Sequence, residues 1–438
     1  MTPCLTKRLH KGQINKPKKL FLLFSYQKLM RFFILIFFSF QFISLQFTLA
    51  NKQPKNGMWI GRLSLNSSTD LPFRIVISKG EQHPVLQIRN GEEKINLIFK
   101  HSSADTLVYV FPEFDSDLYI VFKSKESFSG YWHNKNRKGK YTIALNGRFC
   151  KNDLFECGPN KAITKNSLAK KWRTEFSPSS DDLFPAIGLF NQTNTSVVGT
   201  FLTETGDFRF LDGNFYTDKL YLSCFDGSHA FLFTADLIND TLKGEFYSGN
   251  HYKTDWLAVA DESYELTDPN KLTYVVNDKK IAFTFNDLNL KSFHYPNETF
   301  ENKVTIIQIM GSWCPNCMDE TRYFMDLYKK YGAQGLKIIL IGYESGDNEQ
   351  EYIEKLKKLQ GRYSIPFTML VGGAANKNTA SDDFSMLNEI ISFPTSIFID
   401  KQGNINAVHT GFNGPSTGEY YTEYMIETEK RIQKLLKN

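Results

Sequence analysis

Cysteine is scarce in this chain, with six among 438 residues. They are Cys4, Cys150, Cys157, Cys224, Cys314 and Cys317. Small domains that rely on disulfides for stability carry a much denser set. The chain must therefore be held together by its own hydrophobic core. Cysteine chemistry is expected at one place, where Cys314 and Cys317 stand three residues apart.

Acidic residues are absent from residues 1–50, which hold eight Lys and Arg residues. The whole chain has a formal net charge of +5, but the part after residue 50 has 44 basic and 47 acidic side chains. That charge balance does not favour binding to a polyanion, and we predict no nucleic-acid partner. With 41% apolar and 23% charged residues, the chain has the composition of a globular protein.

Residues 1–50 have the pattern of a leader with a secretory signal peptide. Arg31 precedes 19 uncharged, largely apolar residues, which end in Thr48-Leu49-Ala50 before a polar segment. A basic region, an apolar region and a small residue at the cut define such a signal. We predict that translation starts at Met30 and that the body is exported. The alternative is an uncleaved anchor, since 19 such residues can just span a bilayer. The leader would then be the only membrane contact.

Helical periodicity is nearly absent from residues 55–262, which are predicted to be antiparallel β structure. Short aromatic or β-branched segments there alternate with Gly, Asn, Asp and Ser turns. The predicted strands include 58–65, 72–78, 106–111, 117–123, 141–145, 220–223, 230–235 and 241–247.

Landmarks in this β region recur in the same order at offsets of 111 to 114 residues. The pairs are Trp59 and Trp172, Phe114 and Phe225, and Gly130 and Gly244. This pattern favours a duplicated barrel or sandwich, with a first unit at 51–160 and a second at 161–262. The alternative is a chance likeness between two aromatic β segments.

The pattern changes after a polar linker at 263–274. Apolar runs then alternate with amphipathic helical segments, which predicts an α/β domain with a mixed sheet over 275–438. The expected strands are 304–310, 336–343, 366–371, 395–400 and 405–410, and the expected helices are 318–331, 349–359, 384–390 and 419–436.

The segment Trp313-Cys314-Pro315-Asn316-Cys317 is the strongest chemical signal. It follows a predicted buried strand and opens a helix, so Cys314 lies where free N–H groups and the helix dipole stabilise a thiolate. Pro315 suits the first helical turn. Cys317 returns to the same face, so Cys314 can attack a disulfide and Cys317 can resolve the mixed disulfide.

The pair has two alternative uses. A zinc site would need a second pair of ligands, but His294 and His409 stand alone and no second CxxC exists. We predict no metal and no cofactor. An inert structural disulfide is the second alternative. Cys150 and Cys157 could also pair with each other, and Cys224 is expected to be buried or free.

These features together resemble thioredoxin-fold proteins of the TlpA/ResA type, which are bacterial envelope thiol–disulfide oxidoreductases. The resemblance rests on GSWCPNC, on the SFPT segment before a strand, on the β/α order and on HTGFNGPSTGEYY. It implies a redox disulfide between Cys314 and Cys317. Pro394 would be a cis-proline facing that pair, with the preceding backbone pairing with substrate. Trp313, Phe393 and Thr395 would support the site.

The same resemblance gives Glu320 the position of a helix acid that tunes the cysteines. The alternative for Glu320 is a solvated acid that the helix dipole favours in the first turn. Gln308 stands where thioredoxin has a buried acid, so the resemblance does not extend to thioredoxin's proton relay.

The predicted function is therefore an exported oxidoreductase in the periplasm of a Gram-negative bacterium. Its partners would be protein disulfides or dithiols of the envelope and an upstream electron donor. One alternative is an envelope binding or scaffold protein with a vestigial CxxC. Another is a thiol peroxidase, although neither Cys314 nor Cys317 has the Pro-x-x-x-Thr-x-x-Cys context of a peroxidatic cysteine.

Overall fold

The structure is a computed structural model that describes residues 53–438, apart from 138, 151–153, 156–166 and 278–279. The predicted signal peptide, the start at Met30 and Cys157 lie outside the described residues. Among the residues that are described, no helix is long and apolar enough to cross a membrane.

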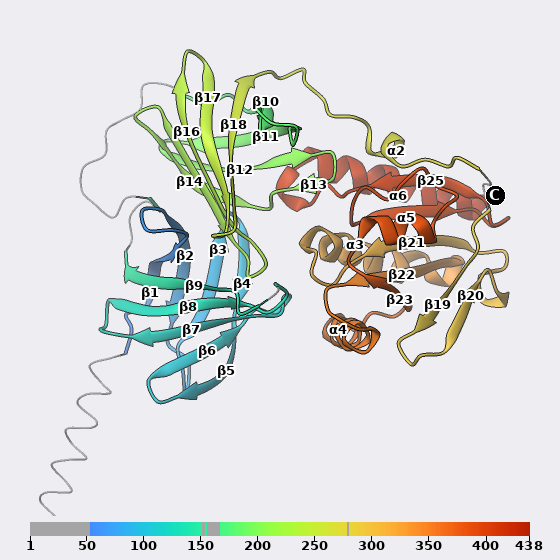
Figure 1. Cartoon of the computed structure of the whole chain (residues 1–438), viewed down its shortest axis with the longest axis horizontal. Helices are drawn as coiled ribbons and strands as arrows, with labels where there is room; N and C mark the ends of the chain where they lie inside the picture. The colour runs from blue at the N-terminus through green and yellow to red at the C-terminus, as the bar shows by residue number, and fades with distance from the viewer. Residues whose placement is uncertain (1–52, 138, 151–153, 156–166, 278–279) are drawn as a thin grey trace, which may run out of the picture. The chain divides into compact units, whose positions relative to one another are not determined.

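The first part of the described chain forms an antiparallel sheet of nine strands in the order β4-β3-β2-β1-β9-β8-β7-β6-β5 (Figure 1). Strands β1 and β9, which come first and last in the sequence of this sheet, are neighbours in it, and Trp59 lies opposite Phe149. The strands are β1 (Gly57–Ser64), β2 (Asp70–Ser78), β3 (Val85–Asn90), β4 (Glu93–Asn96), β5 (Ile98–Ser103), β6 (Thr106–Val110), β7 (Ser116–Phe122), β8 (Ser127–Asn134) and β9 (Thr142–Phe149).

A second antiparallel sheet follows, again of nine strands within the described residues, in the order β11-β10-β18-β17-β16-β15-β14-β12-β13. A further pairing of β11 with β12 closes it into a barrel, which removes exposed edges. The strands are β10 (Lys171–Phe176), β11 (Phe184–Thr193), β12 (Ser196–Thr203), β13 (Gly206–Asp207), β14 (Leu211–Tyr216), β15 (Lys219–Phe225), β16 (Ala230–Ile238), β17 (Thr241–Ser248) and β18 (Tyr252–Ala260).

The two sheets repeat one another in their opening strands. In β1, the indole Nε1 of Trp59 donates to the carbonyl of Lys55 at 2.9 Å. In β10, Nε1 of Trp172 donates to the carbonyl of Ala169 at 2.9 Å. Each opening strand also pairs with the last strand of its own sheet. The antiparallel β class is confirmed, and these likenesses support the predicted duplication, whose boundaries stay a prediction.

Phe225 of the second sheet packs into the core of the first. Its ring centroid lies 4.5 Å from that of Phe73, 5.3 Å from Phe111 and 5.2 Å from Trp132. The Asn90 side chain accepts from the backbone N–H of Phe225 and donates to its carbonyl, both at 3.1 Å. Burying one such ring contributes about 1.5–3 kcal/mol. The second sheet has a core of its own and also contributes Phe225 to the apolar core of the first sheet.

The third sheet has seven strands in the part of the chain that the structure covers, in the order β20-β19-β23-β22-β21-β24-β25. Strands β21, β22 and β23 are parallel, and the others join antiparallel. The strands are β19 (Phe283–Asp287), β20 (Ser292–Tyr295), β21 (Val304–Met310), β22 (Leu336–Glu344), β23 (Thr368–Ala374), β24 (Thr395–Ile399) and β25 (Ile405–Thr410).

Helices cover both faces of this sheet, because alternate strand residues point to opposite sides. Ile306 and Ile338 pack with apolar side chains of α3, α4 and α6. Ile307 and Ile339 pack on the other face, with residues of and after α5. The helices are α2 (Pro269–Leu272), α3 (Pro315–Tyr331), α4 (Glu349–Tyr363), α5 (Lys377–Asp383) and α6 (Glu419–Lys437), and the 3₁₀ turns are η1 (Glu298–Phe300), η2 (Gly332–Gln334) and η3 (Pro415–Thr417).

One predicted helix is wrong. The segment 384–390 is irregular, and helix α5 lies before it. The Asn376 side chain caps α5 by accepting from the backbone N–H groups of the first turn. Phe384, Leu387 and Ile390 are buried at a spacing of three residues, which imitates a helical face. The apolar pattern there reflects anchoring of a loop to the core.

Candidate active site

Cys314 and Cys317 lie at the start of α3, directly after the central strand β21. Cys314 is the N-cap of the helix, and its Sγ accepts from the backbone N–H of Cys317 at 3.2 Å. The two cysteines form a disulfide with their Cα atoms 5.3 Å apart. Cys314 is 6% exposed and Cys317 is 0% exposed. Only Cys314 can be reached from outside, and it is the cysteine that the helix N-terminus stabilises as a thiolate.

The cis-proline segment faces this pair. The Phe393–Pro394 peptide bond is cis, and the Phe393 carbonyl oxygen lies 3.5 Å from Cys314 Sγ. Thr395 begins β24, and its Oγ1 donates to the carbonyl of Ser392 at 2.8 Å. The structure thus brings together two segments that are about 80 residues apart in the chain.

Trp313 and Phe393 form an aromatic wall beside Cys314. The two rings meet edge to face with their centroids 5.9 Å apart. Trp313 Nε1 donates to the carbonyl of Tyr343 at 3.0 Å, and the Phe393 ring stacks on Tyr343 at 5.7 Å. Both indole and phenyl groups are therefore held by the end of β22.

Glu320 lies beneath the pair, in the interior. It is 0% exposed, so the alternative of a solvated acid is wrong. Its carboxylate accepts from Gln308 Nε2 at 2.8 Å, from Ser396 Oγ at 3.0 Å and from the Tyr424 hydroxyl at 2.6 Å. Burial raises the pKa of Glu320 to about 7, against the opposing effect of these donors. Gln308 Nε2 also donates to the carbonyl of Cys317 at 3.2 Å, which joins the acid to the cysteine turn.

Glu344 is a second buried acid at the site, and no motif in the sequence marks it. It ends β22, and it accepts from the backbone N–H of Ser312 at 2.7 Å and from Ser312 Oγ at 2.6 Å. Burial raises the pKa of Glu344 to about 7. The carboxyl ends of parallel strands meet at one edge of a sheet. An acid at the end of an apolar run next to the cysteine strand was the available signal.

A cavity of about 730 Å³ opens over Cys314. Four predicted site residues line it, Trp313, Cys314, Pro315 and Phe393, whereas Cys317, Glu320, Pro394 and Thr395 do not. The remaining walls come largely from the β sheets, with Asn134, Asn136, Arg137, Phe184, Pro185, Thr203, Glu204, Thr205, Gly206, Asp207, Phe208, Ser228, His229 and Phe231. No feature of the sequence predicted these walls.

Other candidate groups do not form a second centre. Cys224 is a buried free thiol, and burial raises its pKa well above the usual range, which makes it a poor nucleophile. Within the described residues, no group of three His, Cys, Asp or Glu side chains could hold a metal ion.

A mixed sheet with a CxxC at the start of its first long helix and a cis-proline before the antiparallel strand β24 defines the thioredoxin fold. Residues 276–408 match the AhpC/TSA family model, so the C-terminal domain is a thioredoxin-fold domain of that family. The predicted resemblance is thereby confirmed for this domain.

Several characterised proteins are similar to the same domain. The thiol-disulfide oxidoreductase ResA of Halalkalibacterium halodurans is 28% identical over 134 residues, which is 31% of this chain and 68% of ResA. The thiol:disulfide interchange protein DsbE of Vibrio cholerae is 27% identical over 148 residues, which is 33% of this chain and 70% of DsbE. These relatives are thiol–disulfide oxidoreductases.

Among solved structures, a protein disulfide isomerase homologue of Bacteroides thetaiotaomicron superposes with a TM-score of 0.29 and 17% identity, over 38% of this chain and 93% of its own. A thiol:disulfide interchange protein of Chlorobium tepidum gives a TM-score of 0.28 and 18% identity, over 37% of this chain and 99% of its own.

Proposed function

We propose that the protein is an exported thiol–disulfide oxidoreductase in which Cys314 attacks and Cys317 resolves. The observation that carries the proposal is the unequal placement of the two sulfurs. Cys314 lines the cavity at the N-terminus of α3, whereas Cys317 is fully buried behind it. A thiolate is favoured at the accessible position, and the second thiol can be reached only from within.

The exchange balances as a two-electron transfer. In the reduced protein the Cys314 thiolate attacks one sulfur of a substrate disulfide, which forms a mixed disulfide and releases the other sulfur as a thiolate. Cys317 then loses its proton and attacks Cys314 Sγ, which releases the second substrate thiolate. The protein ends as the Cys314–Cys317 disulfide seen in the structure, and the substrate ends as a dithiol. A donor dithiol must reduce the protein for the next cycle.

Glu320 is proposed to support the second step. Cys317 is buried, so its proton needs an internal acceptor or a relay. Glu320 lies one helical turn further along α3, and a carboxyl with a pKa of about 7 can change its charge near neutral pH. Gln308 links the two positions through hydrogen bonds to the Cys317 carbonyl and to the carboxylate. Glu320 would therefore act on Cys317 from the interior, through Gln308, without touching the substrate.

The pattern of the leader supports the proposed compartment and partners. A basic segment and an uncharged apolar stretch in residues 1–50 support export to the periplasm of a Gram-negative bacterium, where disulfide-bearing substrates occur. The partners would be envelope proteins with disulfides or dithiols and an upstream electron donor. A fusion of residues 1–50 to a reporter that is active only after export tests this part. An inactive fusion would contradict it.

The experiment on the activity uses the full chain after reduction with dithiothreitol, and an unfolded peptide with one disulfide as substrate. We expect turnover that Cys314→Ser abolishes, and a trapped mixed disulfide with Cys317→Ser. Full activity in both variants would contradict the assignment. An inaccessible dithiol in a redox titration would favour the scaffold alternative, and direct turnover of peroxide would favour the peroxidase.

A further inference from the structure

The turn between β12 and β13 of the second sheet lies between the two loops of the active site. On one side, Asn316 Nδ2 of the CPNC segment donates to the carbonyl of Asp207 at 3.4 Å. On the other side, Ser392 Oγ, two residues before the cis-proline, donates to the carbonyl of Thr205 at 3.2 Å. The approach is so close that a Cβ on Gly206 would lie 2.2 Å from Asn316 Nδ2. The turn therefore covers part of the groove beside the cysteines.

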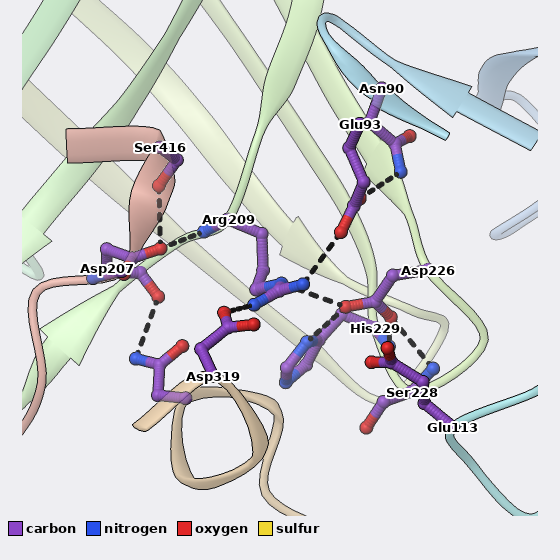
Figure 2. Close-up of polar contacts among 12 residues, drawn as sticks. Asn90, Glu93, Glu113, Asp207, Arg209, Asp226, Ser228, His229, Asp319 and Ser416 are labelled. Atoms are coloured by element: carbon purple, nitrogen blue, oxygen red, sulfur yellow. Dashed lines mark hydrogen bonds and ion pairs between the residues drawn. The ribbon is translucent and has the colours of Figure 1, made fainter. Parts of the chain in front are cut away.

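Asp207 fixes this turn to the thioredoxin domain. Its Oδ2 accepts from the backbone N–H of Gly414 at 2.7 Å, and its Oδ1 accepts from Ser416 Oγ at 2.9 Å. Oδ1 also accepts from the backbone N–H of Arg209 at 2.7 Å (Figure 2). One carboxylate thus ties the turn to the segment before α6 and to the segment between β13 and β14. The turn is therefore hydrogen-bonded to the thioredoxin domain through Asp207 as well as through Thr205.

Arg209 adds a buried charge cluster behind the turn. Its guanidinium, 4% exposed, pairs with Glu93 of the first sheet, with Asp226 of the second and with Asp319 of α3 (Figure 2). The three carboxylates raise the pKa of Arg209 well above its usual range, against the effect of burial. Three separate parts of the chain therefore meet at one cation. These ion pairs fix the position of the turn relative to helix α3.

The cavity that remains over Cys314 has walls of two kinds. Phe184, Phe208 and Phe231 contribute aromatic surface from the second sheet. Asn134, Asn136, Arg137, Ser228 and His229 contribute polar groups, and Ser228 Oγ donates to the Trp313 carbonyl at 3.4 Å. Aromatic surface suits an apolar side chain, and the amide and hydroxyl groups suit a peptide backbone.

We propose that the β sheets form a substrate chamber that selects disulfides on extended peptide segments and excludes disulfides on folded surfaces. A volume of about 730 Å³ lies within the usual range of about 300–1,000 Å³ for ligand sites and holds only a few residues. Cys314 lines it and is only 6% exposed, so a rigid protein surface cannot easily bring a disulfide into contact with its sulfur. This inference rests on the proposed function.

The test compares two substrates with the reduced full chain. One is an unfolded peptide with a single disulfide, and the other is a folded protein that carries the same disulfide sequence on its surface. We expect the peptide to be reduced about tenfold faster in kcat/KM. Equal rates for both substrates would overturn the chamber. No reduction of either substrate would contradict the proposed function, and the chamber with it.

Variants that place a large side chain in the cavity test whether the substrate binds there. Asn136→Trp should raise the KM for the peptide about fivefold, because the indole occupies the substrate space. The rate at which iodoacetamide alkylates Cys314 should change less than about twofold. Lys243→Trp is the matched control, since Lys243 is exposed on β17 and does not line the cavity. Glu204→Trp, on another wall, replaces Asn136→Trp if that variant does not fold. An unchanged KM in a folded filling variant would overturn the chamber.

Discussion

Arg209 of the second β sheet donates a hydrogen bond to the carboxylate of Asp319, which stands two residues after Cys317 on helix α3. This bond links the redox helix directly to a residue buried between the β sheets. Arg322 of the same helix donates to Asp319 as well, and it also pairs with Glu113 of the first sheet. The helix that carries the cysteines is therefore fixed to both sheets through charged groups.

Removal of the Arg209 guanidinium should destabilise the protein. Arg209→Leu leaves Glu93, Asp226 and Asp319 as buried carboxylates without their shared cation, and loss of one partner of a buried pair costs about 3–5 kcal/mol. Urea-induced unfolding measures the loss. Arg148→Leu is the control, because Arg148 is exposed on β9. A loss below about 1 kcal/mol in Arg209→Leu would show that the cluster does not hold the parts together.

Glu320 should make stability depend on pH. Its pKa in the folded protein is raised to about 7 by burial, from an ordinary value of 4.5. Below pH 4.5 the group is protonated in both states. Between pH 4.5 and about 7 the unfolded chain releases a proton that the folded chain retains, so the folded state loses about 3 kcal/mol of stability as pH rises.

The variant Glu320→Gln isolates this effect because its amide does not titrate. The stability of the wild type relative to the variant should fall from pH 4.5 to about 7 and stay level above that. Urea unfolding at a series of pH values gives the difference. Glu423→Gln, at an exposed position of α6, should show no such trend. A constant difference between wild type and Glu320→Gln would refute the raised pKa.

Glu344 should hold the loop before the cysteines. Glu344→Ala leaves the Ser312 N–H and hydroxyl without their acceptor, which should cost about 1–3 kcal/mol of unfolding free energy. Because Trp313 and Cys314 follow that loop, peptide turnover should fall as well. The control is Glu301→Ala, at an exposed position. Retention of both stability and rate in Glu344→Ala would remove Glu344 from the site.

The two β sheets should respond alike to substitution of their matching glycines. A Cβ on Gly130 would lie 1.8 Å from the Tyr119 carbonyl oxygen, and one on Gly244 would lie 1.8 Å from that of Thr234. Gly130→Ala and Gly244→Ala must each displace a neighbouring strand, with an expected loss of about 1–3 kcal/mol. Thermal unfolding measures both. A large effect in only one sheet would argue against equivalent positions.

Local pattern was enough to predict much of the thioredoxin domain. The runs 304–310 and 405–410 become β21 and β25 with the predicted ends, because a buried strand shows its apolar character residue by residue. Apolar spacing also explains why the irregular segment around Phe384 has the pattern of a helix. A loop that is anchored to the core at every third residue has the same apolar spacing as a helix.

The site was predicted only in part, because some of its groups act through distant neighbours. Cys314 and Pro394 stood out through motifs, and Glu320 through its place after Cys317. Only its place at the end of an apolar run marks Glu344 in the sequence, and its function depends on which strand ends lie side by side. Thr205 lies more than 100 residues from Cys314 and reaches the site only because the second β sheet packs on the thioredoxin domain.

The central claim is that Cys314 attacks and Cys317 resolves, and competitive alkylation of the reduced protein tests it most directly. The full chain is treated with a limiting amount of iodoacetamide at pH 7, and mass spectrometry measures the label on each cysteine. The account predicts that Cys314 is modified about tenfold faster than Cys317, because it is the accessible sulfur at the helix N-terminus. Equal labelling, or faster labelling of Cys317, would contradict the assignment.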